Sequence, residues 1–272
     1  AWEIRAESTA TRRQPKQRDP WTAAEVALLD EATFAITGEV RTYGHVVVDE
    51  AQDLSPMQLR MIGRRSPAGS VTLLGDLAQA SGVFAPPSWE SVVAHLSTPA
   101  GWRVAELRLG YRSPGDVIEL SSRLLPVAAP GVQPTEAVRT RRGGVTIVEA
   151  ASVPEQVALD AAALAARYGS VAVIGPASSL DALGRAMRAK GLDVALAADP
   201  GGLSHPIALV EATQAKGLEF DAVVVADPAG IVASALDEQR GLRLLYVALT
   251  RPTQALSVVH AGDLPEALRA TA

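Results

Sequence analysis

Short apolar runs rich in β-branched residues alternate with helix-type segments along most of the chain, and this alternation limits the possible folds more than any other feature. Strands are predicted at residues 45–48, 71–74, 104–107, 145–148, 171–174, 194–197, 207–212, 222–225 and 256–260. Helices are predicted at 22–37, 56–65, 89–96, 155–167, 179–190 and 237–249, and another helix starts near 113–114. This order indicates an α/β fold with parallel sheets flanked by helices.

The distribution of these segments predicts three parts. Residues 1–40 are interpreted as a linker followed by a helix, with Thr22 as its N-cap and Glu25 completing a capping box. Residues 41–103 carry too few strands for a complete domain, so they are interpreted as the C-terminal part of a first domain. Residues 104–272 hold enough strands and helices for a complete second α/β domain.

Composition excludes several classes of protein. The 272 residues include no cysteine, which excludes disulfides, a thiolate nucleophile and cysteine-based zinc sites. No apolar run reaches the roughly 18 residues that a membrane span needs, and no secretory signal is recognised, so we expect a cytoplasmic protein. The formal net charge of −5 argues against a surface covered in nucleic-acid-binding charge, although a local basic groove remains compatible with it.

A strand that ends in two acids is the sharpest chemical signal in the sequence: VVVDEAQD at residues 46–53. Carboxylates in this position lie at the C-terminal edge of a parallel sheet, where ligands bind in open α/β folds. Asp49 is a candidate for binding Mg²⁺, and Glu50 is a candidate for deprotonating an attacking water. Acids at a strand end also cap helices, so the prediction depends on the full eight-residue string.

Two further strings follow in order. GDLAQA, at residues 75–80, comes after a predicted strand and places Gln79 where its amide can sense a terminal phosphate. LRLGYRS, at residues 107–113, offers the Tyr111 ring for stacking on a base and the Arg112 guanidinium for phosphate oxygens. Either string alone would be interpreted as an ordinary turn or a surface pair. Their succession after the acidic string favours a functional role.

The last two strings lie in the C-terminal third of the chain. ATQAKGLEFDAVVV, from residue 212, predicts a turn between two strands in which Lys216 and the Gly217 backbone can approach phosphate. Glu219 in the same turn can accept a ribose hydroxyl. LLYVALTRP, from residue 244, predicts a helix that ends near Arg251, a second candidate for the γ-phosphate.

Taken together, the five strings resemble motifs II to VI of the UvrD/Rep-like superfamily 1 helicases, over about residues 46–260. The resemblance implies two RecA-like domains of the P-loop NTPase fold that bind ATP between them and move along a nucleic acid strand. By this resemblance, Asp49 binds magnesium, Glu50 activates water and Gln79 senses the γ-phosphate. The DEAQD and AKGLEFD strings are highly specific to the family.

The same resemblance implies roles for residues of the second domain. Tyr111 stacks on adenine and Glu219 holds the ribose. Arg112 and Arg251 serve as arginine fingers. Within the family the chain is most similar to the HelD branch, because SPMQ follows DEAQD and WTAAEVALLDEA precedes it. HelD-type proteins bind bacterial RNA polymerase and release it from stalled complexes, so RNA polymerase and DNA are the implied partners.

The sequence also departs from the family pattern. No GxxxxGK[ST] loop occurs in it, so the phosphate cradle is expected in an N-terminal half of the same motor, and this chain alone is expected to be inactive. Gly110 and Thr213 replace the usual asparagine and histidine. Two alternatives stay open: a DNA helicase of repair or recombination, and a non-catalytic interaction module that lost its P-loop.

Overall fold

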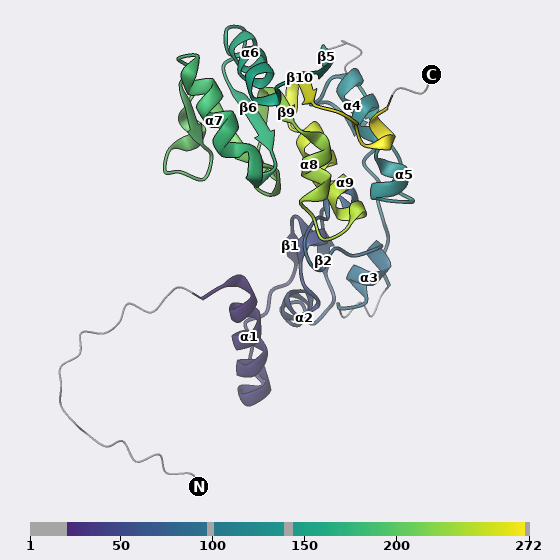
Figure 1. Cartoon of the computed structure of the whole chain (residues 1–272). Helices are drawn as coiled ribbons and strands as arrows, with labels where there is room; N and C mark the ends of the chain where they lie inside the picture. Colours follow the sequence, from purple (N-terminus) through teal and green to yellow (C-terminus); the bar gives the residue numbers. More distant parts are fainter. Residues whose placement is uncertain (1–20, 97–100, 139–143, 270–272) are drawn as a thin grey trace, which may run out of the picture.

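The computed structural model describes residues 21–96, 101–138 and 144–269, and it shows an α/β protein built on parallel sheets (Figure 1). The C-terminal half is centred on a six-stranded sheet with the strand order β5-β10-β9-β6-β8-β7. Every neighbouring pair in this sheet is parallel. The predicted α/β class is therefore confirmed. The strands are β5 (Val145–Glu149), β6 (Val171–Gly175), β7 (Val194–Leu196), β8 (Ile207–Glu211), β9 (Phe220–Ala226) and β10 (Pro252–His260).

Helices cover both faces of this sheet. Helices α6 (Val153–Ala165) and α7 (Leu180–Ala189) pack on one face. The other face is covered by α4 (Gly115–Ser122), α5 (Leu125–Ala128), α8 (Pro228–Ala233) and α9 (Glu238–Leu249). A strand between two helical layers is buried on both sides, and this explains why the central strands are continuously apolar rather than alternating.

Strand β6 illustrates the two cores. Its residues Ala172 and Ile174 face the core beneath α9, whereas Val171 and Val173 face the core beneath α6 and α7. All four side chains are at most 1% exposed. Burial of apolar area on both faces is the main stabilising contribution to such a layer, at about 25 cal/mol per Å² removed from water.

The N-terminal part contains a much smaller sheet. Strand β1 (Val46–Val48) pairs in parallel with β2 (Val71–Leu73), and these two strands complete their sheet within the described residues. Val47, in the middle of β1, is 62% exposed. A two-stranded parallel sheet with an exposed central valine cannot bury a core of its own. The accompanying helices are α1 (Ala23–Thr37), α2 (Pro56–Arg64) and α3 (Trp89–Val93).

The strand predicted at residues 104–107 is wrong. The chain there has no regular structure, and Leu107 is 89% exposed. A short strand lies just beyond it instead: β3 (Leu109–Gly110), which pairs with β4 (Glu136–Ala137) in a separate two-stranded sheet. Apolar spacing indicates which side chains could share a face. Within the described residues, however, no strand lies beside 104–107, so the ladder does not form.

Helix α1 begins and ends as the sequence predicts. Thr22 Oγ1 accepts a hydrogen bond from Glu25 N at 3.2 Å, and Glu25 Oε2 accepts one from Thr22 N at 2.8 Å, which completes the predicted capping box. Gly38 ends the helix with a left-handed φ of 68°. The linker predicted before α1, at residues 1–20, lies outside the described residues. No helix in the described part of the chain is long and apolar enough to cross a membrane.

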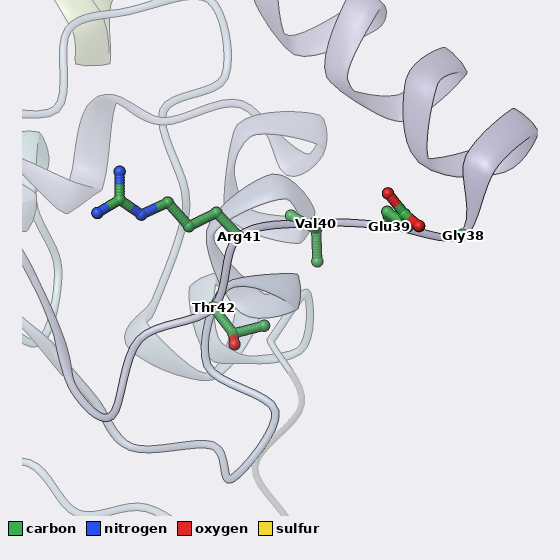
Figure 2. Close-up of a pocket in the computed structure, with 5 residues that line it drawn as sticks. All are labelled: Gly38, Glu39, Val40, Arg41 and Thr42. Atoms are coloured by element: carbon green, nitrogen blue, oxygen red, sulfur yellow. The ribbon is translucent and has the colours of Figure 1, made fainter.

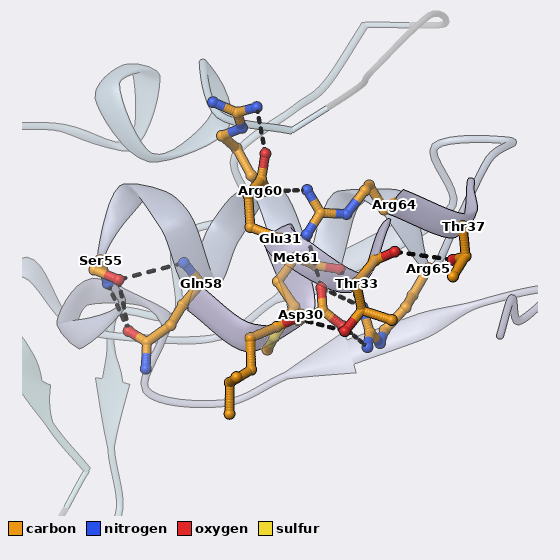
Figure 3. A network of polar contacts seen from close by, with 11 residues as sticks. Asp30, Glu31, Thr33, Thr37, Ser55, Gln58, Arg60, Met61, Arg64 and Arg65 are labelled. Atoms are coloured by element: carbon orange, nitrogen blue, oxygen red, sulfur yellow. Dashed lines mark hydrogen bonds and ion pairs between the residues drawn. The ribbon is translucent and has the colours of Figure 1, made fainter. Parts of the chain in front are cut away.

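Ion pairs join α1 to α2 (Figure 3). Arg64 Nη2 lies 2.7 Å from Asp30 Oδ2, and Arg64 also pairs with Glu31. Arg65 Nη2 lies 2.5 Å from Asp30 Oδ1. The Arg64 guanidinium also lies 4.8 Å from the centroid of the Phe34 ring. Because these groups are partly shielded from water, the network holds α1 against α2 more firmly than exposed pairs would.

This network predicts an acid-sensitive attachment of α1. Hydrogen bonding from Arg65 holds the pKa of Asp30 below its ordinary value, against the opposing effect of burial. The folded pKa is depressed, so the stabilisation is present above the unfolded pKa of about 3.9 and is lost as the pH falls through the folded value. We expect NMR amide signals of α1 to shift as the pH drops below about 4. Asp30→Asn should show the shifted signals already at pH 7. Two results together would contradict this prediction: the α1 signals shift only when those of the six-stranded sheet also shift, and Asp30→Asn leaves the α1 signals unchanged at pH 7.

Candidate functional site

The acids after β1 lie in a tight turn with an unusual backbone conformation. Glu50 has a φ of 53° and a ψ of 36°, a left-handed conformation that is uncommon outside glycine. Asp49 Oδ1 accepts a hydrogen bond from Glu50 N at 2.8 Å, and Ala51 N donates to Leu74 O at 2.9 Å. The turn is thus fastened to the end of β2. Strained conformations of this kind concentrate at functional sites.

Gln52 connects this turn to the loop after β2. Its side chain is fully buried; Nε2 donates to Glu50 Oε2 at 2.6 Å, and Oε1 accepts from Asp76 N at 3.1 Å. Burial alone would raise the pKa of Glu50, but the Gln52 hydrogen bond and the charge of Lys216 outweigh it, so the pKa is lowered. Glu50 is therefore ionised near neutral pH, as a proton acceptor must be. This bridging role of Gln52 is not evident from the sequence.

Gln79 lies between the two halves of the molecule. Its Nε2 donates to Asp76 Oδ2 at 2.9 Å, and its Oε1 accepts from Arg251 Nη2 at 3.2 Å. Asp76 Oδ1 also accepts from Ala78 N at 2.9 Å, which caps the turn that carries Gln79. The amide is therefore held in one orientation, with its oxygen toward Arg251.

Arg251 is buried directly after α9, with 3% of its surface exposed. Its Nε donates to Val247 O at 2.9 Å, and its Nη1 donates to Leu218 O at 3.2 Å. Burial is the main cause that lowers its pKa, followed by the nearby charge of Arg112, whereas the charges of Glu219 and Glu50 act in the opposite direction. The fold thus brings Arg251 close to the other predicted site residues rather than to bulk solvent.

The turn between β8 and β9 supplies three more of the predicted residues, Lys216, Gly217 and Glu219. Lys216 Nζ contacts Asp53 Oδ2, lies 3.2 Å from Glu50 Oε2, and donates to Gln79 O at 3.3 Å. Gly217 has a φ of 76°, which only glycine adopts readily. Lys216, which the sequence predicts to approach phosphate, is therefore engaged with the acidic turn in this structure.

Arg112 and Glu219 form an ion pair with each other. Both side chains are about half exposed, at 47% and 48%. Tyr111, beside Arg112, is 64% exposed. Arg112 and Glu219 lie close enough to Arg251 for their charges to affect its pKa, and Tyr111 lies at the surface with most of its side chain open to solvent.

Oxygen atoms of three residues surround Lys216 beside the acidic turn. Carboxylate oxygens of Glu50 and Asp53 and the carbonyl oxygen of Gln79 already surround its ammonium group. Magnesium prefers such oxygen ligands and takes several of its six from phosphate and water. Among the described residues, no group of three or more His, Cys, Asp or Glu side chains is arranged to hold a metal. Mg²⁺ bound by Asp49, as the sequence predicts, would therefore need nucleotide oxygens as well.

A separate depression lies in the segment between α1 and β1 (Figure 2). It has a volume of about 580 Å³ and is lined by Gly38, Glu39, Val40, Arg41 and Thr42. None of the predicted site residues contributes to it. It has no chemistry in common with the acidic turn, so we do not assign it to the site.

Two solved structures are similar to parts of this chain. The C-terminal domain of a possible DNA helicase from Lactobacillus plantarum WCFS1 is 27% identical, with 58% of this chain and 92% of that chain covered and a TM-score of 0.44. The arterivirus nonstructural protein 10 helicase in complex with DNA is 18% identical, with a TM-score of 0.44. That comparison covers 81% of this chain but only 40% of the viral protein.

A search of curated proteins found no match. One protein family matches a segment of the chain, from the start of β8 to the end of β10. This segment contains Lys216, Gly217, Glu219 and Arg251. Residues 206–259 match the UvrD-like helicase C-terminal domain.

Proposed function

We propose that this chain is the C-terminal part of an ATP-driven nucleic-acid motor of the UvrD-like superfamily 1 type. The hydrogen bond between Arg251 Nη2 and Gln79 Oε1 carries the proposal, because it joins residues 172 positions apart that would contact the same phosphate. The match of residues 206–259 to the UvrD-like helicase C-terminal domain supports it. When bound, MgATP supplies the phosphoryl group that is transferred to water.

On the N-terminal side, Glu50 would take the proton from the attacking water, and Asp49 would hold the magnesium that arrives with ATP. Glu50 can do so only after it separates from Lys216, whose Nζ lies 3.2 Å from Glu50 Oε2. Released from the two acids, Lys216 can turn toward phosphate together with the Gly217 backbone. Binding of nucleotide thus exchanges an intramolecular contact for a contact with the ligand.

On the C-terminal side, Arg251 and Arg112 stabilise the charge on the transferring phosphoryl group. Arg112 must exchange its ion pair with Glu219 for phosphate oxygens, which frees Glu219 to accept a ribose hydroxyl. Tyr111, exposed beside it, stacks on adenine. Because Gln79 follows β2 of the small sheet and Arg251 precedes β10 of the large sheet, loss of the γ-phosphate between them would release one half from the other.

The domain division is part of the proposal. Residues 41–103 form the C-terminal part of a first RecA-like domain, and residues 104–272 form the second. The 62% exposure of Val47 supports this division, because a strand of a complete RecA-like sheet is covered on both faces. A further segment that carries the phosphate cradle would pair with the small sheet and cover Val47.

The isolated 272-residue chain is expected not to hydrolyse ATP. The reason is that its sequence contains no glycine-lysine loop to hold the β- and γ-phosphates, although it carries Glu50 and Arg251. Magnesium-dependent phosphate release by the purified chain tests this, with the Glu50→Gln chain as the blank. Turnover that exceeds the blank and saturates with ATP would contradict the expectation.

Within this class we propose a cytoplasmic, HelD-like role in releasing RNA polymerase, on the basis of the SPMQ and WTAAEVALLDEA strings. The test uses the full-length protein in two assays. Purified bacterial RNA polymerase should be retained on the immobilised protein, and ATP should accelerate its release from stalled complexes. Efficient ATP-driven strand separation without polymerase binding would instead identify a DNA helicase. Absence of ATP turnover would identify a non-catalytic module.

A further inference from the structure

Helix α9, which lies near the small sheet in Figure 1, contacts the loop after β2. Arginine side chains of α9 donate hydrogen bonds to this loop. Arg243 Nη1 donates to Ala80 O at 2.9 Å, and Arg240 Nη2 donates to Val83 O at 3.1 Å. Ala80 directly follows Gln79, whose side chain accepts from Arg251. Successive residues of one loop are thus held by separate positions of one helix and its end.

Arg243 is the buried member of this set, with 5% of its surface exposed. Its Nε donates to Ala128 O at 2.7 Å, at the end of α5. In the described part of the chain, no carboxylate lies within ion-pair distance of it, and burial lowers its pKa while the more distant charge of Asp237 opposes this. A buried guanidinium without a counter-ion is unfavourable. If position 243 served only to pack α5 on α9, an apolar side chain would be more stable there.

The two carbonyl oxygens that Arg243 contacts explain why position 243 holds an arginine. Its planar fork can donate to Ala80 O and Ala128 O at once, in fixed directions, which a lysine ammonium cannot reproduce. Arg243 therefore joins three elements: α9, the end of α5, and the loop that carries Gln79. Neither the sequence strings nor the domain match assigns it a role.

We propose that Arg243 is a positioning residue that keeps Gln79 in register with Arg251. By fixing the Ala80 carbonyl, it limits how far the neighbouring Gln79 can move relative to α9. The inference rests on the proposed function, in which Gln79 and Arg251 contact the same phosphate. Through the hydrogen bonds of Arg243, a movement of the loop at Gln79 would also move α9 and the end of α5.

The first test is amide hydrogen exchange on the 272-residue chain, in Arg243→Met and in the control Arg185→Met on the exposed side of α7. In Arg243→Met, amides in 77–85 are expected to exchange about tenfold faster, since loss of a hydrogen bond to a charged donor frees the loop. The amides of Gln79 and Ala80, which donate to Asp76 O and Leu77 O, report this directly. Faster exchange in 124–129 with no change in 77–85 would reduce Arg243 to a packing residue and overturn the proposal.

Arg243→Lys decides the case if the methionine variant does not fold. The ammonium group keeps the charge but cannot hold both carbonyl oxygens, so 77–85 should still exchange faster than in the wild type. If 77–85 and 124–129 both exchange at the wild-type rate in Arg243→Lys, the proposal is overturned, because the geometry of the guanidinium would then not matter.

A kinetic readout on the full-length protein separates positioning from stability. Arg243→Lys is expected to lower kcat while the KM for ATP stays within about twofold, as for a group that acts on the transition state. In a Gln79→Ala background the same change should have little further effect, because the two residues act as one unit. Full additivity of the two substitutions would contradict the proposal. A wild-type protein without ATP turnover would overturn the proposed function, and the exchange result would then decide the loop attachment independently.

Discussion

Glu50→Gln in the full-length protein is expected to lower ATP turnover by at least about 10²-fold, the typical contribution of a general base. The amide has the same size as the carboxylate, and its oxygen can still accept from Gln52 Nε2, which lies 2.6 Å from Glu50 Oε2. Folding and nucleotide affinity should therefore persist. Phosphate release under saturating ATP measures the turnover, and titration with a fluorescent ATP analogue measures the affinity.

Asp53→Asn is the matched control for this substitution. It removes the other carboxylate that contacts Lys216, without touching the predicted base. We expect a much smaller loss of turnover than in Glu50→Gln, because the change is confined to the lysine contact. If Glu50→Gln instead abolishes ATP binding and leaves substantial turnover per bound nucleotide, Glu50 is a binding residue and its assignment as the base is wrong.

Arg251→Lys is expected to lower turnover by roughly 10³-fold or more, the range found for arginine fingers, with little change in ATP affinity. Lysine keeps the positive charge but loses the fork that reaches Gln79 Oε1 and Leu218 O together. Alanine is the less informative change. It would leave the carbonyl oxygen of Leu218 without its donor and would remove one of the hydrogen bonds to Val247 O, and so destabilise the end of α9.

Arg185→Lys, on the exposed side of α7, serves as the control and should leave turnover unchanged. A thermal melt of each variant shows whether a loss of turnover reflects unfolding. Wild-type turnover in a folded Arg251→Lys protein would show that the finger acts elsewhere, and the proposed link between phosphate and motion would lose its main element.

The sequence predicts the large sheet well because its strands are buried on both faces. Runs such as VAVIG in β6 and FDAVVVA in β9 need no partner information to be recognised, since all their residues except Asp221 are buried. The prediction failed at residues 104–107, where apolar side chains are present but no neighbouring strand is. Helices α5 and α8 were not anticipated, because four and six residues are too short to show a helical period.

The site shows a different limit. The residues that carry the expected chemistry could be identified from five strings, but their contacts could not. Lys216 meets Asp53 across 163 positions, and Arg112 meets Glu219 across 107. Such pairs depend on how two sheets are placed, which no local pattern encodes. Arg243 was overlooked for the same reason, since a helical arginine is usually solvated and only the fold shows that this one is buried.

A structure of the full-length protein with Mg²⁺ and a non-hydrolysable ATP analogue tests the central claim most directly. The account predicts that the Gln79 amide and the Arg251 guanidinium both lie about 3 Å from γ-phosphate oxygens. It also predicts that Lys216 has left Glu50 and that Arg112 has left Glu219. A nucleotide bound elsewhere, with Arg251 still donating to Gln79 and Lys216 still on Asp53, would contradict it.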